Sequence, residues 1–191
     1  MLASYIFQRV EALAEDSAPE VPGHAYYYCY FSRGQEESPH FLQWVISRLC
    51  RQINQIPPEV NEIFHNGGQP STSQLVDVLA AVIQRFPCVY LVIDALDESS
   101  EREKLTKLLL KISEDERFER LQILATGRKE VGIERILLKR TTNISLSNSY
   151  VDDDIELYIR GCLHGDDKLD RLPQELKEEI MIALVDGAEG M

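Results

Sequence analysis

The feature that most constrains this chain is an apolar run, Cys88 to Ile93, that ends abruptly at Asp94. The run is continuous rather than alternating, a pattern typical of a strand buried on both faces of a parallel sheet. Asp94 is followed closely by two more carboxylates, Asp97 and Glu98. Because ligands of open parallel sheets bind beyond the carboxyl ends of the strands, we expect these three side chains to lie at a binding crevice.

Strands and helices alternate on either side of this run. Further strands are predicted over residues 25–31, 121–126 and, more weakly, 143–146. Six helices are predicted. Two have only a predicted start, at Ser38-Pro39 and at a capping box formed by Ser100 and Glu103. The others are predicted over residues 2–15, over residues 75–86, from the acidic run 152–154 to Leu163, and from Pro173 to Val185. Pro57 and Pro58 are predicted to end the second helix, and residues 65–73 to form a loop. This alternation predicts an α/β fold, a parallel sheet with helices on both faces.

The last part of the chain has a different pattern. From about residue 150 onward it is purely helical, so we expect a core over residues 1–149 and the start of a helical subdomain, incomplete, over residues 150–191. The aromatic run from Tyr26 to Phe31 is interpreted as the two pleated faces of one strand, with adenine stacking as a second interpretation.

Composition narrows the class of partner. A net charge of −12 argues against unassisted binding to nucleic acid, which needs a basic surface. No apolar run approaches the roughly 20 residues that span a bilayer, and the amino terminus lacks the apolar core of a signal peptide. The four widely spaced cysteines fit neither a zinc site nor a disulfide scaffold. We expect no membrane partner and a cytoplasmic location.

The three carboxylates allow two interpretations. Asp94 can hold a hydrated magnesium ion while a neighbouring carboxylate orients the water that attacks a terminal phosphate. Alternatively, the acidic side chains only favour the start of the following helix and face solvent. The residues by themselves leave both possibilities open.

A family resemblance favours the first interpretation. The segment VYLVIDALDE resembles the extended Walker B motif of NACHT proteins, a branch of the STAND signal-transduction NTPases with the P-loop NTPase fold. The segments HAYYYCYFS, FLQWVISRLCRQI and LQILATGRKE are similar to other parts of fungal relatives that carry a nephrocystin-like N-terminal domain. The resemblance implies that Asp94 binds Mg²⁺, that Asp97 and Glu98 activate water, and that Arg128, supported by Thr126, contacts the terminal phosphate of ATP or GTP. Without the resemblance, Arg128 would be interpreted as a solvated surface charge.

One part of the family's nucleotide site is missing from the sequence. No GxxxxGK segment followed by Ser or Thr occurs, although this loop cradles the phosphates in P-loop proteins. In the family, residues like LASYIF follow that loop closely, so the resemblance implies a fragment that begins just after it. The strand before the loop would lie between the strand at residues 121–126 and the last strand. We therefore expect weak nucleotide binding and little activity from this chain alone.

The resemblance predicts a nucleotide-dependent switch. In the leading hypothesis the parent protein is an ATP- or GTP-dependent switch whose nucleotide state governs self-association and signalling. The alternative is a catalytically inactive interaction module that keeps the NTPase architecture as a scaffold. A metal-dependent phosphoesterase that uses Asp94, Asp97 and Glu98 is a third possibility, but the sequence offers it no second ligand cluster.

Overall fold

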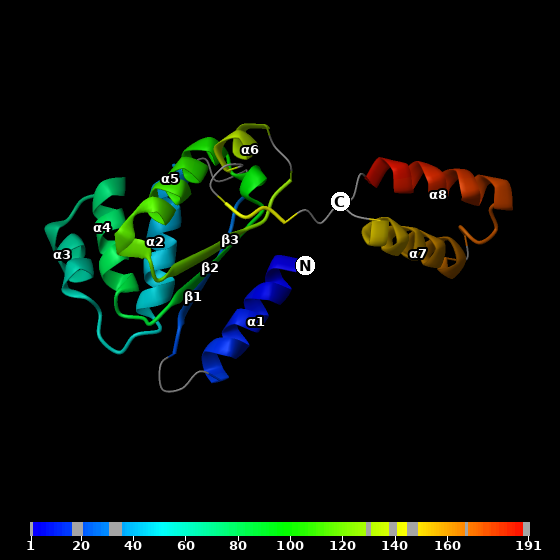
Figure 1. The fold of residues 1–191 in the computed structure, drawn as a ribbon. Helices are drawn as coiled ribbons and strands as arrows, with labels where there is room; N and C mark the ends of the chain where they lie inside the picture. Colours follow the sequence, from blue (N-terminus) through cyan, green and yellow to red (C-terminus); the bar gives the residue numbers. More distant parts are fainter. Residues whose placement is uncertain are drawn as a thin grey trace. The chain divides into compact units, whose positions relative to one another are not determined.

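The computed structural model describes residues 2–16, 21–30, 36–128, 131–137, 141–144, 149–166 and 168–188. The chain divides into two compact units, residues 1–141 and residues 142–191. In the first unit helices cover a parallel sheet, and in the second two helices pack together (Figure 1). The domain boundary predicted between residues 149 and 150 stays a prediction, because a compact unit is not yet an independently folding domain.

The described strands form one parallel sheet in the order β1, β2, β3. Its members are β1 (Gly23–Tyr28), β2 (Val89–Asp94) and β3 (Leu121–Ala125). Strand β2 is central, and its last residue, Asp94, is aligned with Tyr28 of β1. The three strongest strand predictions are confirmed within two or three residues at their ends.

Helices cover both faces of the sheet, as predicted. The Tyr26 ring packs on Phe7 of α1 (Leu2–Asp16), with ring centroids 5.3 Å apart. The next residue, Tyr27, packs edge-on against Phe41 of α2 (Glu37–Cys50), at 5.1 Å. Because successive strand residues point to opposite faces, α1 and α2 lie on opposite sides of the sheet.

The main core lies on the α2 side of the sheet. Helix α4 (Thr72–Ile83) begins at a capping box formed by Ser71 and Gln74, and α5 (Arg102–Glu114) connects β2 to β3 through a short 3₁₀ turn, η2 (Glu116–Phe118). These helices and the strands bury apolar side chains that include Phe41, Leu42, Val45, Leu49, Leu79, Ile83, Leu91, Ile93, Leu105 and Ile112. On the α1 side, Val92 of β2 is only 2% exposed. Strand β2 is thus buried on both faces, as its continuous apolar run predicts.

Two predicted helix caps are wrong. Helix α2 begins at Glu37 rather than after a Ser38 cap, because the buried Glu37 carboxylate accepts a hydrogen bond from the Tyr27 hydroxyl. The Glu37 amide in turn donates to the Glu101 carboxylate at 3.2 Å. Helix α5 begins at Arg102 with no side-chain cap, so the predicted Ser100–Glu103 capping box does not form. At the start of α2, tertiary contacts that a local pattern does not contain replace the predicted cap.

Other differences concern short elements. Pro57 and Pro58 do follow the end of α2, but Pro58 also opens a helix that was not predicted, α3 (Pro58–Asn66). Proline suits the first helical turn, where its missing N–H costs nothing. A further short helix is α6 (Val131–Leu137). Of the strand predicted over residues 143–146, residues 143 and 144 are irregular, and the other two lie outside the described residues.

The second unit contains α7 (Ser149–Gly165) and α8 (Gln174–Ala188). Helix α7 begins three residues before the acidic run that was predicted to cap it, whereas α8 follows Pro173 as predicted. The ammonium of Lys177 donates to the carboxylate and the main-chain carbonyl of Asp170, at 2.8 Å each. This ion pair lowers the pKa of Asp170 and ties α8 to the loop before it.

Leu79→Ala should lower the free energy of unfolding by about 2–5 kcal/mol, because Leu79 of α4 is fully buried in the hydrophobic core and the truncation leaves a cavity. Urea denaturation measures the change. Ile56→Ala is the control: Ile56 is 49% exposed, so its loss should alter the free energy of unfolding by less than about 1 kcal/mol. Equal effects of the two substitutions would contradict this core assignment.

Candidate functional site

The predicted site residues gather at the carboxyl ends of the strands. Asp94 is the last residue of β2, and Thr126 directly follows β3. Asp97 and Glu98 lie in η1 (Leu96–Glu98), the 3₁₀ turn that leaves β2. Arg128 follows Thr126 by two residues and is exposed. We call this group of five residues the carboxyl-edge site.

The Asp94 carboxylate is held between two hydroxyl groups. The Tyr26 hydroxyl, from β1, donates to Asp94 Oδ2 at 2.8 Å. The Thr126 hydroxyl, from the end of β3, donates to Asp94 Oδ1 at 2.6 Å. Both neighbouring strands therefore fix the orientation of the carboxylate, and neither donor neutralises its charge.

Thr126 also shapes the turn that follows Asp94. Its hydroxyl accepts a hydrogen bond from the Ala95 amide at 3.2 Å, and its carbonyl accepts one from the Leu96 amide at 2.8 Å. Ala95 has φ 57° and ψ 50°, the left-handed conformation that is unfavourable for residues with a Cβ. This turn reverses the chain immediately after β2, so that Asp97 and Glu98 lie beside the end of the sheet.

Close packing brings the segment after β3 against Asp97. A Cβ at Gly127 would lie 3.0 Å from Asp97 Oδ1 and 3.4 Å from the Asp97 main-chain nitrogen. A side chain at this position would press on the Asp97 carboxylate, which would have to move by a few tenths of an ångström. Arg128, the next residue, is therefore attached to the chain beside Asp97, although its side chain extends into solvent.

Two tyrosines of β1 belong to the site, although the sequence interpretation made them part of a strand, with adenine stacking as a second possibility, and predicted no contact with the carboxylates. Tyr28 donates its hydroxyl to Glu98 Oε2 at 3.3 Å, and the charge of Glu98 raises the pKa of Tyr28. Burial, reinforced by the hydrogen bond to Asp94, raises the pKa of Tyr26 to about 12. The i, i+2 spacing of Tyr26 and Tyr28 was the available signal, because it places both rings on one face of the strand.

The site fits a cation held through water better than a direct protein cage. In the described part of the chain, no Lys or Arg forms an ion pair with the side chains of Asp94, Asp97 or Glu98. The same residues contain no group of three or more His, Cys, Asp or Glu side chains placed to hold a metal ion. Each Asp94 oxygen accepts one hydrogen bond and keeps a second lone pair, which suits the hydrated Mg²⁺ of nucleotide sites.

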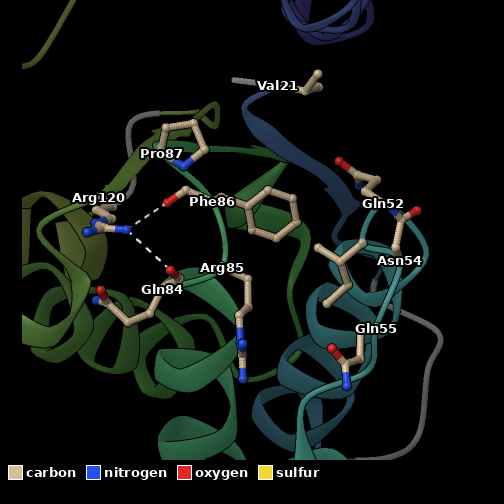
Figure 2. A pocket seen from close by; sticks show the side chains of 10 residues that line it. Val21, Gln52, Asn54, Gln55, Gln84, Arg85, Phe86, Pro87 and Arg120 are labelled. Carbon is tan, nitrogen blue, oxygen red and sulfur yellow. Dashed lines mark hydrogen bonds between the residues drawn. The ribbon is translucent and has the colours of Figure 1, made fainter. Parts of the chain in front are cut away.

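A separate hollow lies at the opposite end of the sheet. It encloses about 810 Å³ and is lined by residues just before the strands, among them Val21, Pro87 and Arg120 (Figure 2). The guanidinium of Arg120 donates to the carbonyls of Gln84 and Phe86, at 3.2 and 3.0 Å, and so holds the end of α4. None of the predicted site residues lines this hollow, and we assign it no part in the chemistry.

Tyr26→Phe should lower the free energy of unfolding by about 1–2 kcal/mol near neutral pH, because it removes a hydrogen bond to a charged group. The Tyr26 phenol ionises near pH 12 when folded and near 10 when unfolded, so the native state binds this proton more tightly. The excess in the free energy of unfolding of wild type over Tyr26→Phe should therefore be constant below about pH 10 and be lost as the pH rises toward 12.

Urea denaturation of wild type and Tyr26→Phe at about pH 8 and pH 11 measures this difference, and subtraction removes the contribution of the other tyrosines. Tyr5→Phe, at a side chain 61% exposed, is the matched control and should show no such trend. A difference between wild type and Tyr26→Phe that grows with pH would contradict the assignment.

Ala95→Gly should raise the free energy of unfolding by about 0.5–1 kcal/mol, because the relief of left-handed strain exceeds the entropy cost of glycine. The same substitution at Ala12, exposed within α1, should lower it by a similar amount. Thermal or urea unfolding of the pair checks the opposite signs, and two losses of stability would show that Ala95 is not strained.

We compared the chain with protein-family models, curated proteins and solved structures, and a family model matches the part that contains the sheet. The family model described as nephrocystin 3, N-terminal, matches residues 1–128, which is 128 of the 191 residues and includes the three described strands and the carboxyl-edge site. No significant match was found among curated proteins or among solved structures. None of the described helices is long and apolar enough to cross a membrane. The chain belongs to the nephrocystin 3 N-terminal family.

Proposed function

We propose that the carboxyl-edge site is the magnesium- and water-handling half of a nucleoside triphosphate site, within a STAND-type signalling NTPase of the NACHT branch. One observation carries the proposal. Asp94, at the end of the central strand, is held in one orientation by two neutral hydroxyls, and no Lys or Arg of the described residues forms an ion pair with it. A carboxylate prepared in this way suits a hydrated cation that also bridges phosphate oxygens.

Each residue has a distinct task in the proposed site. Asp94 holds the water shell of Mg²⁺, and Asp97 and Glu98 orient or deprotonate the attacking water. Arg128, exposed beside Asp97, reaches the terminal phosphate of ATP or GTP with a guanidinium that no described carboxylate occupies. Thr126 was predicted to support that contact. Because its hydroxyl donates a hydrogen bond to Asp94, we assign it instead, with Tyr26, to positioning the carboxylate.

The phosphate cradle has to come from a glycine-rich loop that the printed sequence lacks. The proposed function therefore belongs to a form of the protein that includes such a loop, in which nucleotide state controls self-association and signalling. The competing proposal is an interaction scaffold whose assembly ignores nucleotide. The phosphoesterase hypothesis gains no support, since the described residues offer no cluster of metal ligands.

Asp94→Asn should weaken magnesium-dependent nucleotide binding by about tenfold or more in a form extended upstream to include the loop, because the amide cannot balance the charge of the cation. Fluorescence anisotropy of a labelled ATP analogue, with and without Mg²⁺, measures the affinity. The isosteric change should leave the far-ultraviolet circular dichroism spectrum unaltered.

Asp154→Asn, at an exposed position in α7, is the matched control and should bind like wild type. Nucleotide binding by the extended form, but not by the chain without the loop, would support the proposal that the loop holds the phosphates and the carboxyl-edge site handles magnesium and water. If the folded extended form binds no nucleotide, the NTPase proposal fails. Size-exclusion chromatography that shows association unchanged by ATP and Mg²⁺ would then favour the scaffold.

A further inference from the structure

The hollow at the amino ends of the strands is formed by four segments of one compact unit. They are residue 21, just before β1; residues 52–55, which follow α2; residues 84–87, between α4 and β2; and Arg120, just before β3. Among these lining residues Arg120 alone comes from the β3 side of the sheet. With a volume of about 810 Å³, the hollow has the size of a ligand site.

The floor of the hollow is apolar and held in place. The Phe86 ring is 4% exposed and packs on the main chain of Gly23, where a Cβ would lie 2.9 Å from two ring carbons. Ile53 packs against the hydrophobic core beside it. Val21, at the rim, is 50% exposed. A ligand in the hollow therefore meets an apolar surface whose shape is set before binding.

Gln52 holds one side of the hollow. The amides of Gly23 and Cys29 donate to carbonyls of β2, so the main-chain groups of His24 point outward. The Gln52 carbonyl accepts a hydrogen bond from the His24 N–H at 3.0 Å, and the Gln52 amide group donates to the carbonyls of His24 and Arg48, at 2.7 and 2.9 Å. Gln52 thus makes the two bonds that a neighbouring strand would make, and both its N–H groups are used.

Arg120 and Gln84 lie on the other side of the Phe86 ring in Figure 2. The Gln84 amide donates to the Arg117 carbonyl at 2.9 Å, and Arg120 Nη1 donates to the carbonyls of Gln84 and Phe86. No carboxylate of the described residues forms an ion pair with Arg120. Its charge is therefore uncompensated there, and its Nε and Nη2 groups remain able to donate.

Three other lining side chains, those of Arg85, Asn54 and Gln55, are exposed and form no hydrogen bond with the described residues (Figure 2). No Asp or Glu lines the hollow, although Asp and Glu outnumber Lys and Arg in the whole chain by 32 to 20. The hollow thus combines two unpaired guanidinium groups with uncommitted amides in a chain that is otherwise strongly acidic.

We propose that the hollow binds an acidic peptide segment, with a carboxylate at Arg85 and Arg120 and a neighbouring apolar side chain on Phe86. A guanidinium pairs with a carboxylate through two parallel N–H donors. The amides of Asn54 and Gln55 carry both donors and acceptors, which match the C=O and N–H groups of a peptide main chain. Inorganic phosphate offers no N–H group and no apolar part, so these neighbours favour a peptide over a simple anion.

Fluorescence anisotropy of a labelled hexapeptide of alternating glutamate and leucine, titrated with the 191-residue chain without nucleotide or Mg²⁺, tests the proposal. Arg85→Gln removes one guanidinium and should weaken binding about tenfold, the effect of losing a hydrogen bond between charged groups. Arg9→Gln, at an exposed position in α1, changes the net charge equally and should bind like wild type. No binding, or equal losses from the two substitutions, would overturn the proposal.

Two competitors separate a peptide from a simple anion. A hexapeptide with glutamine in place of glutamate should bind about tenfold more weakly, because it offers no charge to the guanidinium groups. Inorganic phosphate should also compete about tenfold more weakly than the unlabelled acidic peptide, because it lacks the groups that meet the amides and the apolar floor. Equal binding of the glutamine peptide would contradict the role of charge, and equal competition by phosphate would contradict the choice of a peptide.

A nuclear magnetic resonance titration of wild type guards against a variant that fails to fold. The side-chain NH₂ signals of Asn54 and Gln55 should shift as the acidic peptide is added. Those of Gln74, in the capping box at the far end of α4, should stay in place. Shifts that spare Asn54 and Gln55 would refute the site. The nucleotide-binding test is independent of this result, because no residue of the carboxyl-edge site lines the hollow.

Discussion

Strand β2 is hydrogen-bonded along both edges and buried on both faces, and the positions of the other elements follow from it. Its odd-numbered residues enter the large core under α2, α4 and α5, while Val92 is covered on the α1 side. A strand confined in this way has little freedom to shift in register, since a one-residue slip would exchange its two faces. The residue at its carboxyl end therefore has a fixed position.

That residue is Asp94. Its two hydrogen bonds come from different strands, so the carboxylate also joins β1, β2 and β3 at the end of the sheet. Because the donors are neutral hydroxyls, they orient the carboxylate without forming an ion pair with it. A lysine or arginine in the place of Tyr26 would neutralise the carboxylate and compete with any cation, whereas a phenol whose pKa is about 12 stays neutral and keeps donating.

The sequence predicted the parts of the fold that depend on strong local patterns. The apolar run of β2, the α/β alternation and the gathering of carboxylates near Thr126 and Arg128 could be derived in this way. The start of α2 could not, because Glu37 is held by Tyr27 and Glu101, which are near it only in the folded chain. Helix α3 was missed because Pro57 and Pro58 were interpreted as stopping or redirecting the preceding helix, not as opening a new one. The roles of Tyr26 and Tyr28 depend on strand register, which brings their hydroxyls level with carboxylates about 70 residues away.

The Gln52 amide shows how indirectly an edge strand can be protected. A side chain beyond the end of α2 takes the place of a neighbouring strand for His24, so the protection of β1 is encoded 28 residues away from it. Loss of that amide would remove both of these hydrogen bonds from the outward edge of β1. An outward row of main-chain groups is a template on which another chain can add a strand. A substitution 28 residues away in the sequence would then decide whether the β1 edge is open to pairing with another chain.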